Sequence, residues 1–238
     1  MAQTLLSGSR VAFFGGSFDP PHLGHLAVAR AAQAALGLDR VLFAPVGAQP
    51  LKPQGSSAGF QDRLAMTRLA IAADPGFALS MADEPKPGGA PNFTLETLLA
   101  LRAQLSPGGE LFCLMGADSF LGLRRWHRAA EIPLAASLIV ASRPGEGLED
   151  LQAALPSGLT LHPAPDSPTF SDAVVELRAY LLRNSAEETA PFYLLPGLEV
   201  EISASEIRRQ LRAATRSRPS ALVPDAVSDY IRIHGLYR

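Results

Sequence analysis

Short apolar runs alternate along this chain with longer segments in which apolar residues recur among polar ones. The apolar runs have the length of buried strands and lie at 10–16, 40–46, 77–83, 110–118 and 137–143. The longer segments predict helices at 26–37, 61–74 and 93–105. Continuous apolar strands that alternate with helices are typical of a parallel sheet covered on both faces. The pattern therefore predicts an α/β fold built on a doubly wound parallel sheet.

The pattern weakens after Arg143. Residues 143–168 are rich in proline and glycine, which predicts loops around one short strand at 159–163. An amphipathic helix is predicted at 171–184 and a strand at 191–197. We found no linker and no repeat, so we expect a single domain over 1–238. Within it, 143–191 is a loop-rich variable insertion and 200–238 is a helical C-terminal portion with two helices separated by a proline-containing turn.

Composition narrows the class of protein. The chain has 238 residues, of which 47% are hydrophobic and 18% charged, a balance that favours a packed globule over disorder. The formal net charge of −2 offers no broad basic field for nucleic acid. Cys113 is the single cysteine, which excludes an internal disulfide and fits a reducing cytoplasm. No apolar run approaches membrane-spanning length and the N-terminus lacks a signal-peptide pattern, so we expect neither a membrane span nor export.

The turn after the first predicted strand concentrates unusual residues. Gly15 and Gly16 allow the backbone to approach a ligand closely, and the two prolines that follow suit a helix start. His22 and His25 are three residues apart, so they share one face of a first helical turn, beside free N–H groups at the positive end of the helix dipole. Together these groups suit a polyphosphate.

Other interpretations of this turn stay open on spacing alone. No lysine follows the glycines, which excludes the phosphate loop of the G-x-x-x-x-G-K-[ST] type, and the spacing is not G-x-G-x-x-G either. A zinc site would need three or four ligands, but His127, His162 and His234 are scattered, and the nearest carboxylate, Asp19, precedes the pair. Two surface histidines in an ordinary turn are the remaining alternative.

The sequence "GGSFDPPHLGH" resembles the signature of the nucleotidyltransferase superfamily that carries the [HT]-x-G-H motif. In that superfamily this turn follows the first strand of a Rossmann-like sheet and holds the triphosphate of ATP or CTP. The resemblance implies that the following residues bind the nucleotide: Gly15, Gly16, Ser17, Phe18, His22, Gly24 and His25.

A second segment, "EISASEIRRQL", predicts a helix start near Ser203, because Ser203 and Glu206 have the spacing of a capping box. A helix N-terminus with hydroxyls and an arginine also suits phosphate; an ordinary capped surface helix is the alternative. The segment resembles the I-S-S-T-x-[IL]-R motif of the same superfamily, with Ala204 in place of a serine. The matching residues, which the resemblance assigns to ATP, are Ile202, Ser203, Ser205 and Arg208.

Several further residues suit a nucleotide substrate. Lys52, in the loop after the second strand, could reach the phosphates, or it could be a solvated lysine. Gly116 and Asp118 end a strand where a carboxylate can meet a ribose hydroxyl, although Asp118 could merely cap a helix. Trp126, the only tryptophan, stands among arginines and His127, a setting that suits stacking on a flat heterocycle; a place in the core is the alternative.

Taken in order, residues 10–142 and 192–238 resemble the bacterial nicotinate-nucleotide adenylyltransferases, one family of that superfamily. The resemblance implies a nicotinate-nucleotide site made by Ser17, Lys52, Phe93, Thr94, Trp126 and His127. Phe93 stands where tyrosine is commoner in the family. Thr94 has a second interpretation, because it also lies where a helix-capping residue would be.

The expected reaction is adenylyl transfer from ATP to nicotinate mononucleotide, with Mg²⁺ bound to ATP. The expected catalytic residues are His22, His25, Lys52 and Arg208. No general base is needed, because the attacking phosphate oxygen is already charged. Nicotinamide mononucleotide, phosphopantetheine or a polyol phosphate are alternative acceptors, and a non-catalytic nucleotide-binding protein is an alternative of another class. The sequence does not predict an oligomeric state.

Overall fold

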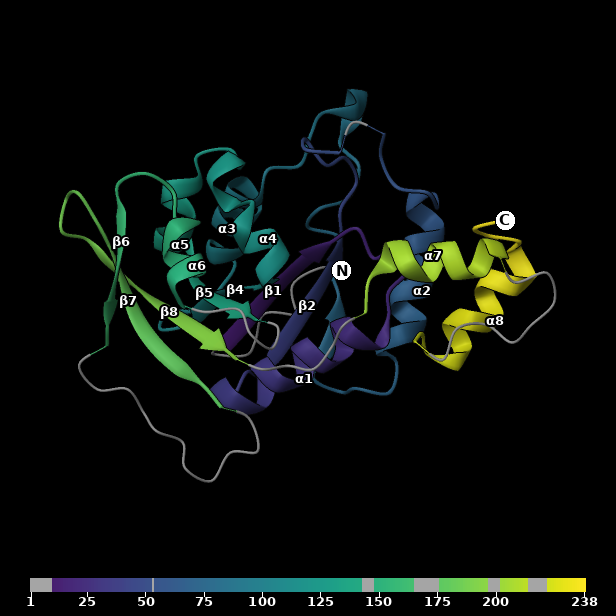
Figure 1. The fold of residues 1–238 in the computed structure, drawn as a ribbon, viewed down its shortest axis with the longest axis horizontal. Helices are drawn as coiled ribbons and strands as arrows, with labels where there is room; N and C mark the ends of the chain where they lie inside the picture. Colours follow the sequence, from purple (N-terminus) through teal and green to yellow (C-terminus); the bar gives the residue numbers. More distant parts are fainter. Residues whose placement is uncertain (1–9, 53, 143–147, 165–175, 197–201, 214–221) are drawn as a thin grey trace. The chain divides into compact units, whose positions relative to one another are not determined.

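The computed structural model describes residues 10–52, 54–142, 148–164, 176–196, 202–213 and 222–238 (Figure 1). Within these residues the strands form one eight-stranded sheet in the order β3-β2-β1-β4-β5-β8-β7-β6. The strands are β1 (Arg10–Gly16), β2 (Arg40–Pro45), β3 (Phe77–Leu79), β4 (Glu110–Gly116), β5 (Ser137–Ala141), β6 (Leu159–Pro163), β7 (Arg178–Asn184) and β8 (Thr189–Leu195).

From β1 to β5 helices lie between successive strands, as the apolar pattern predicts, whereas β6, β7 and β8 follow one another without a helix between them in the described part of the chain. The α-helices are α1 (Leu23–Leu36), α2 (Phe60–Ile71), α3 (Thr94–Arg102), α4 (Ala117–Leu121), α5 (Ile132–Ala135), α6 (Leu148–Ala153), α7 (Ala204–Ala213) and α8 (Asp225–His234). None of the helices within the described ranges is both long enough and apolar enough to cross a membrane.

The chain divides into two compact units. The first unit contains residues 1–14, 28–41 and 93–199, and the second contains residues 15–27, 42–92 and 200–238. Our expectation of a single domain over 1–238 stays a prediction.

The first unit contains the parallel strands β4, β5 and β8, and β4 also pairs in parallel with the part of β1 that belongs to this unit. Their side chains form the core: Leu138, Ile139 and Val140 in β5 have no exposed surface. A strand covered on both faces has no solvent-facing side to mark with polar residues, which explains why these strands are continuous apolar runs.

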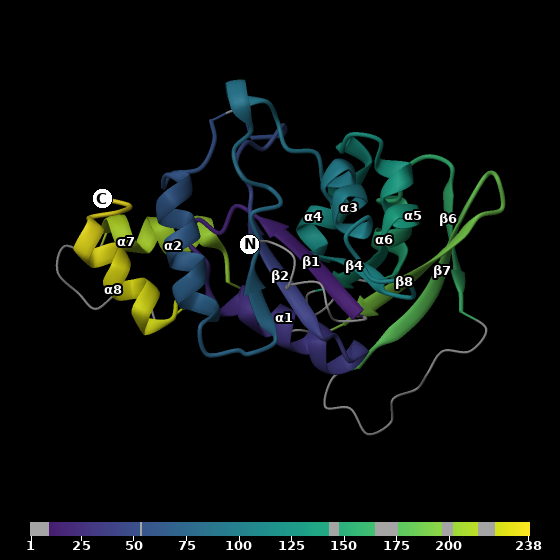
Figure 2. The ribbon, with the colours of Figure 1, turned by 180° about the vertical axis from the view of Figure 1, so that it is seen from behind.

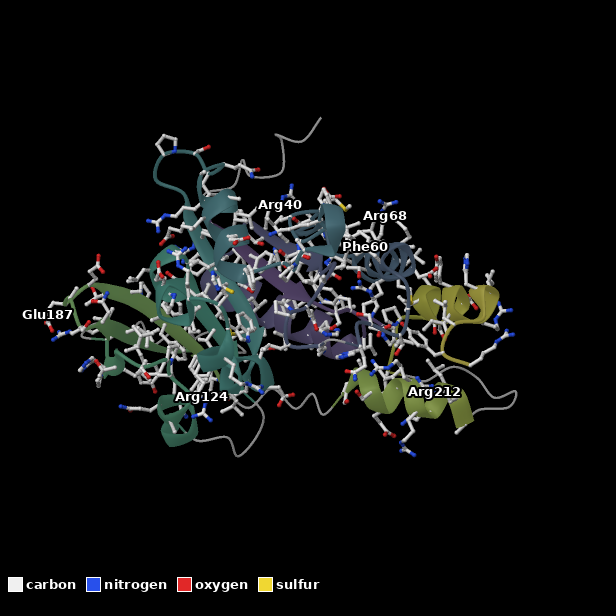
Figure 3. All side chains as sticks on the ribbon, turned by 90° about the horizontal axis from the view of Figure 1, so that it is seen from above. Arg40, Phe60, Arg68, Arg124, Glu187 and Arg212 are labelled. Carbon is white, nitrogen blue, oxygen red and sulfur yellow. The ribbon has the colours of Figure 1, made fainter. Side chains whose placement is uncertain are left out.

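The outer strands of the first unit correct one prediction. Residues 171–184 were predicted to form a helix, but β7 (Arg178–Asn184) is a strand that pairs antiparallel with β8 and with β6. Residues 171–175 of that prediction lie outside the described residues. The turn into β8 explains the difference, because the Asn184 side chain accepts hydrogen bonds from the N–H groups of Ala186 (3.0 Å) and Glu188 (2.9 Å). Glu187 lies at the tip of this hairpin (Figure 3).

Four helices of the first unit lie together beside its parallel strands. Both ribbon views show α3, α4, α5 and α6 as one group (Figures 1 and 2). The helix α6 (Leu148–Ala153) falls in the segment predicted to be loop-rich with only one strand, so that prediction missed a helix of six residues. Two apolar side chains anchor this segment, since Leu151 and Ala154 are buried.

The second unit contains the predicted C-terminal helices α7 and α8 with α2 and β3. The three helices lie together in both ribbon views (Figures 1 and 2). α2 contacts α8, where the Tyr230 hydroxyl donates to the Asp62 carboxylate (3.0 Å). α8 ends at Gly235, whose φ of 62° is the left-handed conformation that glycine accepts most readily.

Candidate active site

The turn that joins β1 to α1 lies between a strand and a helix, as its sequence predicts. β1 ends at Gly16, and α1 begins at Leu23, directly after His22. The His22 carbonyl accepts the N–H of His25 (3.0 Å), which places both histidines in the first turn of the helix. We call residues 15–25 the first turn; they belong to the second unit.

His22 and His25 lie on one face, as predicted, with their rings stacked at a centroid distance of 3.7 Å. The backbone N–H of His22 donates to Nδ1 of His25 (3.2 Å). Because Nδ1 accepts a hydrogen bond, the hydrogen of the neutral imidazole must lie on Nε2. His25 is therefore arranged as a donor through Nε2.

Both imidazoles are neutral near pH 7. Burial lowers the pKa of His22 to about 4, and burial together with the neighbouring His22 lowers the pKa of His25 well below its usual range. Nδ1 of His22 is buried, and it has no hydrogen-bond partner in the part of the chain that the structure describes. A buried polar atom without a partner is uncommon in a folded protein and is consistent with a ligand-binding role.

The helix start offers fewer N–H groups than the sequence predicted. The N–H of Leu23 donates to the carbonyl of Leu222 (2.9 Å), and the N–H of His22 is already bound to His25. The expectation of free N–H groups beside both histidines is therefore wrong for these two amides, because protein acceptors occupy them.

Lys52 reaches the first turn from the loop after β2. Its Nζ donates to Oγ of Ser17 (3.2 Å), and Nε2 of Gln49 donates to the same oxygen (3.0 Å). Lys52 is exposed, so its ammonium group can meet a soluble anion. The structure thus brings together two predicted site residues, Ser17 and Lys52, that lie 35 positions apart.

Arg208 reaches the same turn from α7. Its guanidinium donates to the backbone carbonyl of Asp19 (2.6 Å) and to Oγ of Ser205 (3.1 Å). Ile202 and Ser203 precede this helix, and the Ser203 carbonyl accepts the N–H of Ile207 (3.0 Å), as expected for a helix that starts there. The predicted capping partner Glu206 instead accepts hydrogen bonds from residues further along the helix, Arg209 (2.7 Å) and Gln210 (3.0 Å).

Gly16 and Phe18 shape the first turn. Phe18 has a φ of 46°, unusual for a residue with a side chain, and its ring is buried. The ring packs edge-on against His25 at a centroid distance of 4.9 Å. A Cβ on Gly16 would lie 3.2 Å from this ring, so glycine lets the ring approach the strand end. Gly15 is half-buried and Gly24 is buried in the first turn of α1.

Asp19 is a residue of the first turn to which sequence reasoning assigned no role. Its buried carboxylate accepts hydrogen bonds from the N–H of Ser57 (2.6 Å), the N–H of Ala58 (3.0 Å) and the hydroxyl of Tyr237 (2.7 Å). Its place within the "FDPPH" stretch was the available signal. Its partners could not be found that way, because Tyr237 is 218 positions away.

Arg63 is a second residue that the sequence did not reveal. This buried arginine of α2 donates to the backbone carbonyls of Ser17 (2.7 Å), Val46 (2.8 Å) and Ala58 (3.3 Å). Burial lowers its pKa from the usual range, and the nearby Asp19 carboxylate opposes that effect. Arg63 therefore ties the first turn to the end of β2 and to the loop before α2.

The remaining predicted residues belong to the first unit. The rings of Phe93 and His127 lie 4.3 Å apart, and Trp126 is half-exposed, outside the buried core. Thr94 is the first residue of α3, whose cap position is Phe93, so Thr94 is not the cap. We call Phe93, Thr94, Trp126 and His127 the ring group. Arg124, labelled in Figure 3, is an exposed cation two positions before Trp126.

Gly116 and Asp118 lie where β4 gives way to α4. Gly116 is the last residue of the strand, and Asp118 is exposed in the first turn of the helix. Asp118 does not cap the N-terminus of α4, because Gly116 occupies the cap position. An exposed carboxylate at the carboxyl end of a strand of a parallel sheet is well placed to meet a hydroxyl of a ligand.

Among the described residues, no three histidine, cysteine, aspartate or glutamate side chains come together as a metal cage. The oxygens that Mg²⁺ prefers are abundant on a triphosphate. His25 of the first turn, and Lys52 and Arg208 that bond to this turn, contribute instead donor and cationic groups, which suit the phosphates rather than the metal.

Comparisons with known proteins agree on one family. A family model described as cytidylyltransferase-like matches residues 13–210. A probable nicotinate-nucleotide adenylyltransferase of Gloeobacter violaceus is 37% identical over 230 residues, which cover 97% of each chain. One of Thermus thermophilus is 38% identical over 229 residues, 96% of this chain and 100% of that protein.

A solved structure shares the fold. Plasmodium falciparum nicotinic acid mononucleotide adenylyltransferase complexed with NaAD aligns with a TM-score of 0.67 over 96% of this chain and 97% of that one, at 15% identity. That likeness concerns architecture, whereas the two bacterial relatives match in sequence over nearly the full length. The chain therefore belongs to the cytidylyltransferase-like family and, within it, to the nicotinate-nucleotide adenylyltransferases.

Proposed function

We propose that this protein transfers the adenylyl group of ATP to nicotinate mononucleotide, giving deamido-NAD and pyrophosphate. One observation carries the proposal: Lys52 and Arg208, from two distant segments, both bond to the turn that holds the stacked His22 and His25. The names of the relatives supply the acceptor, and the matched length supports its transfer to this chain.

The chemistry needs little beyond positioning and charge stabilisation. An oxygen of the acceptor's 5′-phosphate forms a bond to the α-phosphorus of ATP. The bond from that phosphorus to the oxygen bridging to the β-phosphorus breaks, and pyrophosphate leaves with the electron pair. The nucleophile is already an anion, so the neutral histidines need not remove a proton.

We assign His25 to the transferring phosphate, because the N–H of His22 occupies its Nδ1 and the ring hydrogen therefore lies on Nε2, which makes His25 a donor. His22 lies beside it. Lys52 and Arg208 hold the β- and γ-phosphates as charged donors. Mg²⁺ enters as part of the substrate Mg–ATP, where it neutralises phosphate charge.

We assign the remaining predicted residues to the two nucleosides. The ring group would hold the nicotinate ring by stacking and polar contact, and Gly116 with Asp118 would meet the ATP ribose. The glycines of the first turn, Phe18, Ile202, Ser203 and Ser205 would line the ATP site, with Ser17 shared by both substrates. We place the reaction in the cytoplasm, with small molecules rather than nucleic acid as partners, in keeping with a net charge of −2.

The decisive experiment measures pyrophosphate release by purified protein with ATP and Mg²⁺. Nicotinate mononucleotide, nicotinamide mononucleotide and phosphopantetheine are supplied separately. Release that is fast with the acid acceptor alone is the expected result. Pyrophosphate release with a different acceptor would mean that this acceptor is the substrate. ATP binding without pyrophosphate release under any condition would mean that the protein is a non-catalytic nucleotide-binding protein.

A further inference from the structure

Asp19 joins three separate segments of the second unit. It lies in the first turn, three positions before His22, and its carboxylate is buried. Both carboxylate oxygens are bound to the loop before α2, through the N–H groups of Ser57 (2.6 Å) and Ala58 (3.0 Å). That loop is the continuation of the segment that carries Lys52.

Arg208 is bound to the same residue. Its guanidinium donates to the Asp19 carbonyl (2.6 Å) and lies 3.8 Å from the Asp19 carboxylate. The carboxylate thus lies between the backbone of one loop and the guanidinium of α7. Each of the three segments that Asp19 joins carries a group that we assign to the phosphates: His25, Lys52 or Arg208.

Tyr237 completes this arrangement from the last residues of the chain. Its side chain is buried, and its hydroxyl donates to Oδ1 of Asp19 (2.7 Å). Burial and the adjacent carboxylate raise the pKa of Tyr237 far above its usual range, so the hydroxyl remains a donor at any physiological pH. Without this donor the buried Asp19 side chain would have one hydrogen bond fewer, which is costly for a buried polar group.

We propose that Tyr237 is a positioning residue for the triphosphate site, which acts by holding Asp19 and, through it, the first turn and Arg208. This inference rests on the proposed function for the identity of the ligand. Small displacements of groups that bind a transferring phosphate can cost about a hundredfold in rate, so a residue that fixes their spacing contributes without touching substrate.

The test compares Tyr237→Phe with Tyr230→Phe. Tyr230 is a matched control, because it also lies in the C-terminal segment and also donates to an aspartate, Asp62 (3.0 Å), but that aspartate is outside the first turn. Tyr237→Phe keeps the ring and removes one hydroxyl. We expect its KM for ATP to rise about tenfold, as for loss of a hydrogen bond to a charged group, with its KM for nicotinate mononucleotide nearly unchanged.

The control variant should keep both KM values of the wild type. A merely structural hydroxyl would lower the melting temperature in both variants and leave the KM values alone. Tyr237→Phe kinetics that equal those of Tyr230→Phe would therefore overturn the inference. Asp19→Asn is a second variant, which removes the charge beside Arg208 and should raise the KM for ATP in the same selective way.

Calorimetric binding of an ATP analogue with a methylene bridge between the α- and β-phosphorus separates this inference from the proposed function. Wild-type protein that binds the analogue but releases no pyrophosphate from ATP in the presence of nicotinate mononucleotide would contradict the function alone. The inference would still be tested by whether Tyr237→Phe or Asp19→Asn binds the analogue about tenfold more weakly. Wild-type affinity in every folded variant would overturn the inference whatever the activity.

Discussion

His25 is held as a neutral imidazole with its hydrogen on Nε2, because the backbone N–H of His22 occupies Nδ1. The segment from His22 to His25 therefore both begins helix α1 and fixes the tautomer of His25. A donor that is fixed before substrate arrives needs no reorganisation when charge develops on the phosphate, which is how such groups lower a barrier.

Replacing His25 by alanine should lower kcat by a few hundredfold or more, since one aimed donor is worth about 3–4 kcal/mol of barrier. Steady-state pyrophosphate release measures this loss, and circular dichroism checks the fold. His162→Ala, at an exposed histidine of β6, is the matched control and should retain full activity. A His25→Ala enzyme within tenfold of wild type would remove His25 from the mechanism.

Burial of His22 should make stability depend on pH. Its pKa is about 4 in the folded protein against 6.5 when unfolded, so the unfolded chain binds more protons between these values. The free energy of unfolding should therefore be unaffected by this group above pH 6.5 and fall as the pH drops toward 4. Between pH 7 and pH 5 the loss from His22 is about 2 kcal/mol.

Urea unfolding at pH 7 and pH 5 measures this effect in wild type and in His22→Gln. Glutamine does not titrate, so the variant should lose about 2 kcal/mol less than wild type between the two values. An equal loss in both proteins would mean that His22 is not the group responsible.

Among the elements, the loop after β2 shows how backbone packing can position a side chain, Lys52, that we assign to the phosphates. The N–H of Gly47 donates to the carbonyl of Asp83 (2.7 Å), and a Cβ at Gly47 would lie 2.5 Å from Cα of Pro85. The Asn92 side chain adds two bonds, to the N–H of Ala48 (3.0 Å) and the carbonyl of Glu84 (3.0 Å). These contacts hold the segment that leads to Lys52.

Gly47→Ala should destabilise the fold by roughly 2 kcal/mol, because backbone atoms must move to admit the methyl group. It should also raise the KM for ATP by displacing the Lys52 loop. Gly59→Ala is the control: its Cβ would meet only the Asp62 carboxylate at 3.4 Å, and its φ is −60°. Thermal unfolding and kinetics of both variants measure the difference. Equal melting temperatures would show that the loop yields easily.

The mistaken helix at 171–184 illustrates where element prediction failed. A run such as "RAYLLRN" is short enough to suit either a helix or a strand. Pairing with β8 and β6 decides for the strand, since each neighbour satisfies backbone groups along the same residues. The strands β6 and β8 lie outside residues 171–184, the segment from which the helix was predicted.

At the scale of the whole molecule, the α/β sheet agrees with the order of apolar runs in the sequence. The family agrees with the resemblance carried by the motifs. The outer strands β6 and β7 make the sheet mixed rather than wholly parallel. The parallel part needs crossover helices and shows as alternating runs, whereas the antiparallel part needs only a tight turn, which leaves a weaker pattern.

Removal of divalent metal should stop catalysis without loosening the protein. We expect a chelator to abolish pyrophosphate release and leave the melting temperature of nucleotide-free protein unchanged, because we propose that Mg²⁺ binds as a component of the substrate Mg–ATP. Calorimetry with and without the chelator makes the comparison. A lower melting temperature in the chelator would reveal a structural metal.

The sequence by itself determined the alternation of strands and helices and the place of the first turn, since both follow from local patterns of apolar residues, glycine and proline. It also singled out His22, His25 and Arg208, because they stand in recognisable motifs. These features depend on residues within one turn or one element of each other.

Only the tertiary structure decided which distant residues bond to the first turn. Asp19 accepts hydrogen bonds from Tyr237 and Arg208, which lie 218 and 189 positions away in the sequence. Arg63, buried in α2, donates to three backbone carbonyls. Hydrogen bonding of buried polar groups is a requirement of the folded state, and a sequence does not name the partners that meet it. The same holds for the neutral histidines, whose lowered pKa is a consequence of burial.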